Sequence, residues 1–241
     1  MSPPSTYLFG DLSASPILWI TFTLLVYLGA LKLYRHFNSH PLLLPVLTGV
    51  VVVVGVLLLT GTPFEHYASG TDFLIFLIGP STVALAVPLY SQIRRLKRLW
   101  LPITVALLVG SITAIASALG IGWLFGASVE TLVSLAPKSA TMPISMEVSR
   151  VTGGLPSFTI VAVGITGIGG AIMTGWLLRL LRITDPVVHG FTLGLSAHAI
   201  GTARAFQVGD TAGAFAALGM SLTGIATAFL VPVILALMGW F

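Results

Sequence analysis

The chain has 241 residues, of which 56% are hydrophobic and only 7% are charged. A soluble domain ordinarily carries about 25% charged residues, so this composition excludes a soluble protein and indicates an integral membrane protein. The apolar runs are about 20 residues long, which is the length of a membrane-spanning helix, and they lack the alternation of an outer-membrane barrel. Because the chain has no cysteine, it can form neither disulfides nor thiolate metal sites.

The net charge of +4 comes from basic residues that cluster at the ends of the apolar runs. Lys and Arg in short connections mark the cytoplasmic side of a membrane, so we interpret this charge as topology-setting and expect no nucleic-acid partner. No positively charged stretch precedes the first apolar run. We therefore expect this run to be a retained span rather than a signal peptide.

The predicted fold is an all-α polytopic membrane protein with about six full spans plus two re-entrant or broken helical segments. We expect the architecture of an inverted-repeat transporter in a single transmembrane domain over residues 1–241. Its predicted parts are a tail at 1–16, spans one to four within 17–125, a re-entrant or broken segment at 130–150, span five at 155–182, a second such segment at 187–209, and a last span at 212–240.

The first four spans follow from apolar runs at Ile17–Tyr34, Leu42–Thr60, Phe73–Ile93 and Trp100–Phe125. The third run differs from the others because it contains Pro80 and Pro88. Each proline removes a helix hydrogen bond, so we predict a break in this span.

Basic residues at the ends of spans one, three and five predict that these ends are cytoplasmic and that the amino terminus is outside. The expected location is the inner (plasma) membrane, with multiple passes. In this topology residues 130–150 enter and leave the membrane on one face, and residues 187–209 do so on the opposite face. The alternative is that both segments simply span the membrane, which would invert the later topology.

Residues 130–150 are expected to fold back as two legs of about 15 Å each, half the hydrocarbon thickness. The tip would lie near Pro137 to Pro143, and the tip of the second segment near Ser196 to Gly201. Many transporters build their substrate site where two such segments meet. A short similarity between residues 80–89 and residues 137–144 also favours two halves related by inversion.

Two cations in the polar segments, Lys138 and Arg204, predict a site for a small anion. A guanidinium group suits a carboxylate, and free N–H groups at broken helix ends attract anions. The alternatives are an ion pair of Arg204 and Lys138 with Glu147 or Asp210, or snorkelling of their charges to the membrane surface. The remaining predicted substrate-binding residues are Ser139, Thr141, Ser196, His198, Gly201 and Thr202, helped by Ser81 and Thr82. For each hydroxyl, the alternative is a bond to its own backbone.

Glu147 and His198 are the two groups expected to change charge usefully at depth, because burial raises the pKa of a Glu in general and a His titrates near neutrality. Either group could couple proton entry to substrate entry, and coupling to Na⁺ is equally open. A neutral histidine bonded to backbone is the alternative for His198. We expect no serine nucleophile with a histidine base, because Ser196 and His198 are two residues apart and do not face each other on a helix. The sequence also has no metalloprotease or phosphate-loop motif, so we expect no enzymatic activity, no cofactor and no metal site.

Two polar segments of the chain resemble the LrgB family of membrane proteins. They are Ala136-Pro137-Lys138-Ser139-Ala140-Thr141-Met142-Pro143-Ile144 and Gly194-Leu195-Ser196-Ala197-His198-Ala199-Ile200-Gly201-Thr202-Ala203-Arg204. Gly153-Gly154-Leu155-Pro156 and the span-three run from Ile78 to Tyr90 match it as well, so the resemblance covers residues 40 to 238. Members of that family are described as antiholin-like in bacteria and as exchangers of glycolate and glycerate in plastids, and some are tied to pyruvate uptake.

The resemblance therefore implies a small monocarboxylate of the glycolate, glycerate or pyruvate class as the substrate. Because the broken segments cluster in the second half of the chain, we expect a secondary transporter that works by alternating access of the elevator type. The other function that it implies is an antiholin-like regulator of a holin-type pore and of murein hydrolase export. A small LrgA-like membrane partner follows from the resemblance, and a homodimer is the usual companion of the elevator mechanism. Ala140 and Met142 depart from residues found in some relatives, so the resemblance does not identify the substrate.

Overall fold

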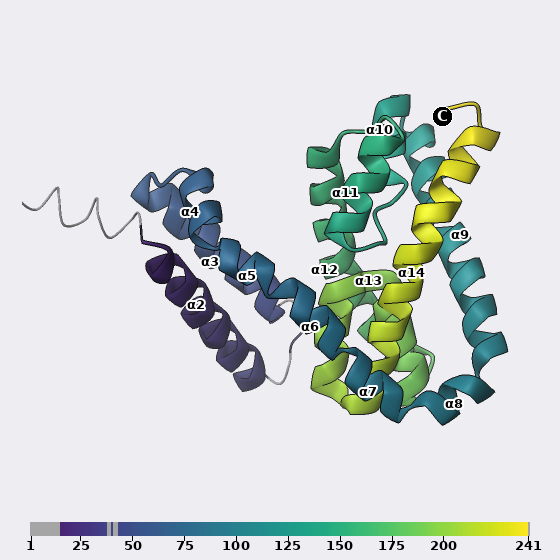
Figure 1. Ribbon diagram of the computed structural model, residues 1–241, viewed down its shortest axis with the longest axis horizontal. Coiled ribbons are helices and arrows are strands. Elements are labelled where there is room, and N and C mark those ends of the chain that lie inside the picture. The colour runs from purple at the N-terminus through teal and green to yellow at the C-terminus, as the bar shows by residue number, and fades with distance from the viewer. Residues whose placement is uncertain (1–14, 38–39, 41–42, 241) are drawn as a thin grey trace, which may run out of the picture. The chain divides into compact units, whose positions relative to one another are not determined.

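The computed structural model describes residues 15–37, 40 and 43–240, apart from the side chains of Ile78, Ser81, Thr82 and Pro88. Helices and their connections make up this described part, which contains no strand (Figure 1). The prediction of an all-α protein is confirmed. The helices group into two compact units, one ending at Ala84 and one beginning at Leu85. The prediction of a single transmembrane domain stays a prediction.

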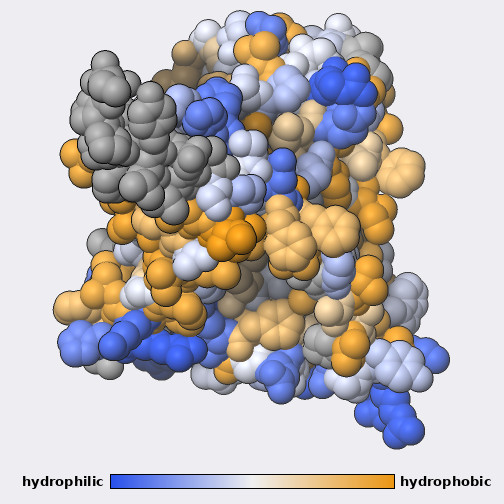
Figure 2. Space-filling view, turned by 60° about the vertical axis from the view of Figure 1, so that its left-hand side comes forward, coloured by the Kyte–Doolittle hydropathy of each residue, from blue (hydrophilic) through white to orange (hydrophobic). Residues whose placement is uncertain are grey.

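Among the described residues, four helices are long and apolar enough to cross a membrane, namely α2 (Pro16–His36), α9 (Trp100–Leu124), α12 (Pro156–Leu180) and α14 (Asp210–Leu237). They correspond to predicted spans one, four, five and the last. The helix α3 (Pro45–Thr60) is apolar but has only 16 residues, and Leu42, the predicted start of span two, lies outside the described residues. Hydrophobic side chains make up much of the visible surface (Figure 2), as expected for a chain surrounded by lipid.

The predicted third span is interrupted twice in the structure. It consists of the short helices α5 (Asp72–Phe76), α6 (Ile78–Ala84) and α7 (Ala86–Ser91). The interruptions at Leu77 and Leu85 each lie three residues before a proline, Pro80 or Pro88. A proline ring clashes with the carbonyl four residues earlier, so each helix breaks upstream of its proline. The predicted break is confirmed.

In the first unit, α2 packs against α3 and α4 (Phe64–Gly70). The ring of Trp19 meets the edge of Tyr67 with centroids 5.7 Å apart. The hydroxyl groups of Thr23 and Tyr67 are 3.0 Å apart and share a hydrogen bond. Gly70 is required here because a side chain would collide with Trp19. These contacts hold the short α4 against α2.

In the second unit, α14 packs against α7, α9, α11 (Met142–Val151) and α13 (Pro186–Val208). Its residues from Ala212 to Met220 are all buried, nine in succession. A helix can be buried on every side only if its neighbours approach closely, and most of these residues are alanine or glycine. The first half of α14 is therefore the centre of this unit.

The approach of α13 to α14 depends on two glycines one helical turn apart. A Cβ on Gly190 would overlap the backbone carbonyl of Ala212, and a Cβ on Gly194 would overlap that of Ala216. Small residues at this spacing let helix backbones touch in membranes, where association depends on close packing.

Two apolar clusters align α9 with α14. One cluster contains Ile103 of α9 with Phe215 and Leu218 of α14, and also Val187 and Phe191 of α13. The other contains Ile115 and Leu119 of α9, Val231 and Leu235 of α14, and Leu132, Val133, Ala136 and Val148. Residue numbers rise together along this seam, so the two helices run in the same direction.

Candidate functional site

The predicted re-entrant segment at 130–150 forms a helical hairpin, which we call the first hairpin (residues 129–151). It consists of α10 (Val129–Leu135), a connection at residues 136–141, and α11. The connection lies within the predicted tip region. At 1.5 Å per residue the two helices are about 10 and 15 Å long, which is too short to cross a bilayer about 30 Å thick.

Polar contacts join the two helices of the first hairpin to the start of α12. The hydroxyl of Thr159 donates to the carbonyl oxygen of Ser134 at 2.9 Å and to Oγ of Ser149 at 2.8 Å. The backbone amide of Leu155 donates to Oγ of Ser134 at 2.7 Å. Since residues 134 and 149 meet at one threonine, the chain has reversed direction between them.

The connection of the first hairpin is fixed by one buried hydrogen bond. Oγ of Ser145 donates to the carbonyl oxygen of Pro137 at 2.7 Å. Ala140 is fully buried and Ser139 is 7% exposed. The connection is thus a packed part of the protein.

Replacing Ser145 with alanine is expected to lower the stability of the protein by about 0.5–1.5 kcal/mol, because one buried hydrogen bond would be lost. The carbonyl of Pro137 would keep only its bond from the amide of Ala140, at 3.1 Å. The measurement is the thermal unfolding of the detergent-purified variant. Ser117→Ala is the matched control, since that exposed hydroxyl only bonds to Ala114 on its own helix. Equal unfolding temperatures for the two variants would contradict the structural role of Ser145.

The predicted segment at 187–209 is α13, which we call the second hairpin (residues 186–208). The helix is broken at His198, whose φ of 41° and ψ of −126° are far from helical. A Cβ on Gly201 would overlap the carbonyl oxygen of Leu193, although eight residues along a straight helix span about 12 Å. The chain therefore folds back at His198, inside the region predicted for the tip.

The ring of His198 is held by α12. Its Nε2 lies 3.1 Å from the carbonyl oxygen of Val163, and the side chain is 3% exposed. Gly167 leaves room for the ring, since a Cβ there would collide with it. The structure thus shows His198 as a buried histidine bonded to backbone, which is the alternative to a role in coupling.

The other hydroxyls of the second hairpin bond mainly to neighbouring protein groups. Oγ of Ser196 donates to the carbonyl of Thr192 at 2.7 Å and lies 3.0 Å from Oγ1 of Thr174. Oγ1 of Thr202 donates to the carbonyl of His198 at 2.9 Å. Such bonds are ordinary for Ser and Thr in membrane helices, so these two residues stabilise the break.

Both hairpins contact α12 and α14 on successive turns. Along α12, the first hairpin contacts Thr159 and the second contacts Val163. Along α14, Ile144 in the first turn of α11 contacts Gly224, and Thr202 contacts the sulfur of Met220. Four residues of helix are about 6 Å. The reversal points of the two hairpins therefore lie at neighbouring levels in the second unit (Figure 1).

Lys138 lies in the connection of the first hairpin, immediately before α11. Its side chain is partly buried, and its ammonium group makes no hydrogen bond or ion pair with a described residue. Thr141, at the N-cap of α11, makes no side-chain hydrogen bond to the helix. Thr141 therefore provides no side-chain acceptor for the first amide groups of α11, which follow Lys138 by four residues or more along the chain.

The remaining predicted site residues are Arg204, Glu147, Ser81 and Thr82. Arg204 is six residues beyond the break and donates from Nη1 to Oε1 of Gln207 at 3.0 Å. Glu147 is exposed and forms a two-bond ion pair with Arg150, at 2.6 and 3.0 Å. The side chains of Ser81 and Thr82 lie outside the described residues. The joint use of these residues with Lys138 stays a prediction.

Sequence reasoning missed two buried hydroxyls on the seam between α9 and α14. Ser111 is 2% exposed and Thr223 is 1% exposed, and neither hydroxyl has a hydrogen-bond partner among the described residues. Both residues lie between the two apolar clusters of the seam, and Thr223 adjoins Gly224, where α11 packs. In the sequence, these two residues could be recognised only as single hydroxyl residues on the helix faces that otherwise carry the apolar residues of the seam. In these long apolar runs that signal is weak.

Within the described part of the chain, no group of three His, Asp or Glu side chains is close enough to hold a metal ion. The polar groups near the two reversal points are instead a cation, hydroxyls and helix amides. All of these donate hydrogen bonds, and such a set favours an anion.

The sequence matches the LrgB-like family over residues 23–237. It is 35% identical over 218 residues to the uncharacterized protein YxaC of Bacillus subtilis, covering 90% of this chain and 94% of that protein. It is 31% identical to the holin-like protein CidB of Staphylococcus epidermidis, covering 92% and 96%, and 28% identical to the antiholin-like protein LrgB of Bacillus mycoides, covering 93% and 98%. No solved structure matches the chain.

Proposed function

This chain belongs to the LrgB-like family, and from that premise we propose that it acts as an antiholin-like regulator of a holin-type pore and of murein hydrolase export. The observation that carries the proposal is the match along almost the whole chain to relatives named holin-like and antiholin-like. A small LrgA-like membrane protein is the proposed partner.

The membrane-facing surface of the protein supports a role that depends on a membrane partner. In the second unit, α9 and α12 each expose long rows of large apolar side chains. Such rows suit contact with lipid or with an apolar helix of another protein.

Co-reconstitution with a small holin-type protein tests this proposal. Liposomes loaded with a fluorescent dye would carry the holin-type protein alone, or together with this chain at a fixed ratio. Dye release is expected to be lower when this chain is present. An unrelated polytopic protein at the same ratio is the control for crowding of the membrane. Identical release with either added protein would refute the regulatory role.

A second candidate function is favoured by the environment of Lys138, namely the transport of a small monocarboxylate. The ammonium group of Lys138 is partly buried and has no partner among the described residues, which is costly in a membrane unless an anion accompanies it. The amide groups at the start of α11 and the free hydroxyls of Ser111 and Thr223 would add hydrogen-bond donors. A carboxylate of the glycolate, glycerate or pyruvate class fits this set of donors.

The arrangement of the two hairpins supports the finer architecture of this second candidate. We propose that they enter the membrane from opposite faces, since their bases lie at opposite ends of α12 and their reversal points lie at neighbouring levels. With α3 and the interrupted third segment counted as crossings, the chain has six spans and an inverted repeat. The proposed mechanism is alternating access, of the elevator type, in a homodimer of the inner membrane coupled to H⁺ or Na⁺.

Ligand-induced stabilisation tests the second candidate without assuming a transport direction. Glycolate, glycerate and pyruvate would each be added to the detergent-purified protein, with glycolamide as the neutral control. A bound acid at 100 times its Kd is expected to stabilise the fold by about 2.7 kcal/mol. Equal effects of glycolate and glycolamide would exclude a charge-selective site.

A further inference from the structure

The short helix α8 (Ile93–Arg98) carries the densest positive charge in the chain. Arg94, Arg95, Lys97 and Arg98 are all exposed, and the helix contains no acidic residue. Of these four cations, only Arg95 forms an ion pair with a described residue, Asp185, at 3.6 Å. The other three cations have no acidic partner in the described part of the chain.

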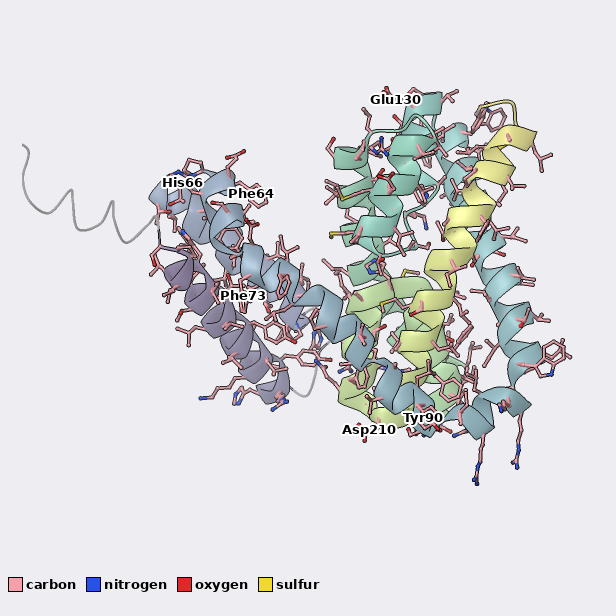
Figure 3. All side chains as sticks on the ribbon, viewed as in Figure 1. Phe64, His66, Phe73, Tyr90, Glu130 and Asp210 are labelled. Carbon is pink, nitrogen blue, oxygen red and sulfur yellow. The ribbon has the colours of Figure 1, made fainter. Side chains whose placement is uncertain are left out.

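Packing fixes the direction in which these cations point. The apolar residues Leu96 and Leu99 pack against the cluster that contains Phe191 and Phe215. The basic side chains consequently project from the opposite side. Figure 3 shows nitrogen-tipped side chains of α8 that extend away from the neighbouring helices.

The same end of the second unit carries further cations and exposed aromatic rings. The ion pair of Arg95 with Asp185 brings the connection that follows α12 close to α8. Arg179 lies in the last turn of α12, and Arg182 lies in this connection. Trp100 is 63% exposed and Tyr90 is 77% exposed, one on each side of α8 along the chain. Trp and Tyr with this exposure are typical of the interface between hydrocarbon and headgroups.

The acidic residues at this end do not balance the cations. Asp185 already accepts a hydrogen bond from the amide of Val187 at 2.7 Å as well as pairing with Arg95. Asp210 lies at the same end as Tyr90 (Figure 3) and forms no ion pair with a described residue. The positive charge of α8 is therefore available to a bound anion.

We propose that Arg94, Lys97 and Arg98 form a binding surface for the headgroups of anionic phospholipids. The helix α8 leads directly into α9, an apolar helix long enough to cross the membrane. Its cations are thereby held within about one helical turn of the headgroup layer. A cluster of Lys and Arg beside a membrane-spanning helix attracts anionic lipid in proportion to its charge.

The test compares two double variants that each remove one Lys and one Arg three residues apart at a helix end. Arg94→Gln/Lys97→Gln alters α8, and Lys32→Gln/Arg35→Gln alters the C-terminal part of α2 as the matched control. Phosphatidylglycerol or phosphatidylcholine would be offered to the purified full chain, and retained lipid would be counted by native mass spectrometry. The unaltered protein is expected to retain phosphatidylglycerol preferentially. The α8 variant should lose this preference by about tenfold or more, and the α2 variant should keep it.

Three outcomes would overturn the proposal. Equal losses in both double variants would mean that any cations at a span end attract anionic lipid. Displacement of phosphatidylglycerol by millimolar inorganic phosphate would point to a soluble phosphate compound instead. Binding of an acidic peptide with no preference between the two lipids would identify a protein partner. Thermal unfolding is the control for the fold of both variants. All four replaced side chains are exposed, so both variants are expected to unfold at the temperature of the unaltered protein.

Discussion

Replacing Gly194 with alanine is expected to destabilise the protein by about 3 kcal/mol, the upper end of the usual cost of overpacking. The added methyl group would overlap the carbonyl oxygen of Ala216 in α14. This oxygen belongs to the backbone of the part of α14 that is buried on every side, so it cannot move aside as a flexible side chain would. The separation of α13 from α14 would also disturb the second hairpin. The measurement is thermal unfolding in detergent.

Two comparisons show whether the backbone contact is responsible. Gly164→Ala is the matched control, because Gly164 lies inside α12 with open space around it, and alanine there should be neutral or stabilising by up to about 1 kcal/mol. The double variant Gly194→Ala/Ala216→Gly should remain as unstable as Gly194→Ala, since the clash is with backbone and not with the methyl group of Ala216. Recovery of stability in the double variant would show that side-chain packing sets the distance between the helices.

The long helices could be predicted from the sequence because lipid imposes a length and a polarity on each span. The predicted span Trp100–Phe125 agrees with α9 to within one residue at its end. The interruptions at Leu77 and Leu85 follow from the prolines three residues later, for a reason that acts within one chain segment. Local chemistry of this kind can be read without knowledge of the tertiary structure.

The location of the two reversals could also be predicted, from the lengths of the polar segments. The residues that each reversal contacts could not be predicted. The carbonyl that binds the ring of His198 belongs to Val163, 35 residues earlier in the chain, and its identity depends on how α12 packs against α13. The internal similarity around residues 80 and 137 does not extend to local structure, because Pro80 is in α6 whereas Pro137 lies in the connection of the first hairpin.

The candidate site shows the same limit. Hydroxyls near a break can bind a ligand or satisfy the backbone, and sequence alone cannot distinguish these roles. In the structure Ser196 and Thr202 bond to backbone, whereas Ser111 and Thr223, within smooth apolar runs, are without partners among the described residues. Glu147 was assigned to coupling, although Arg150 three residues later offered an ordinary helical ion pair. That pair could have been predicted from spacing.

Under the second proposed function, carboxylate transport, replacing Lys138 with glutamine is expected to reduce saturable uptake of a small carboxylate into proteoliposomes by about tenfold or more. A hydrogen bond to a charged group contributes about 1.5–3 kcal/mol, and every 1.4 kcal/mol of binding energy is a factor of ten. The amide of glutamine keeps one donor but removes the charge. Lys32→Gln, at an exposed position near the end of α2, is the control and should leave uptake unchanged.

The stability of the Lys138→Gln variant without ligand separates a binding role from a structural one. A lysine that completes a protein ion pair leaves an unpaired partner when it is removed, so the variant unfolds at a lower temperature. Lys138 has no such partner among the described residues, and its ammonium group is partly buried. Neutral glutamine should therefore leave the unfolding temperature unchanged or raise it, while the stabilisation by added carboxylate disappears. A lower unfolding temperature with intact carboxylate uptake would show that the charge serves the fold and that the anion binds elsewhere.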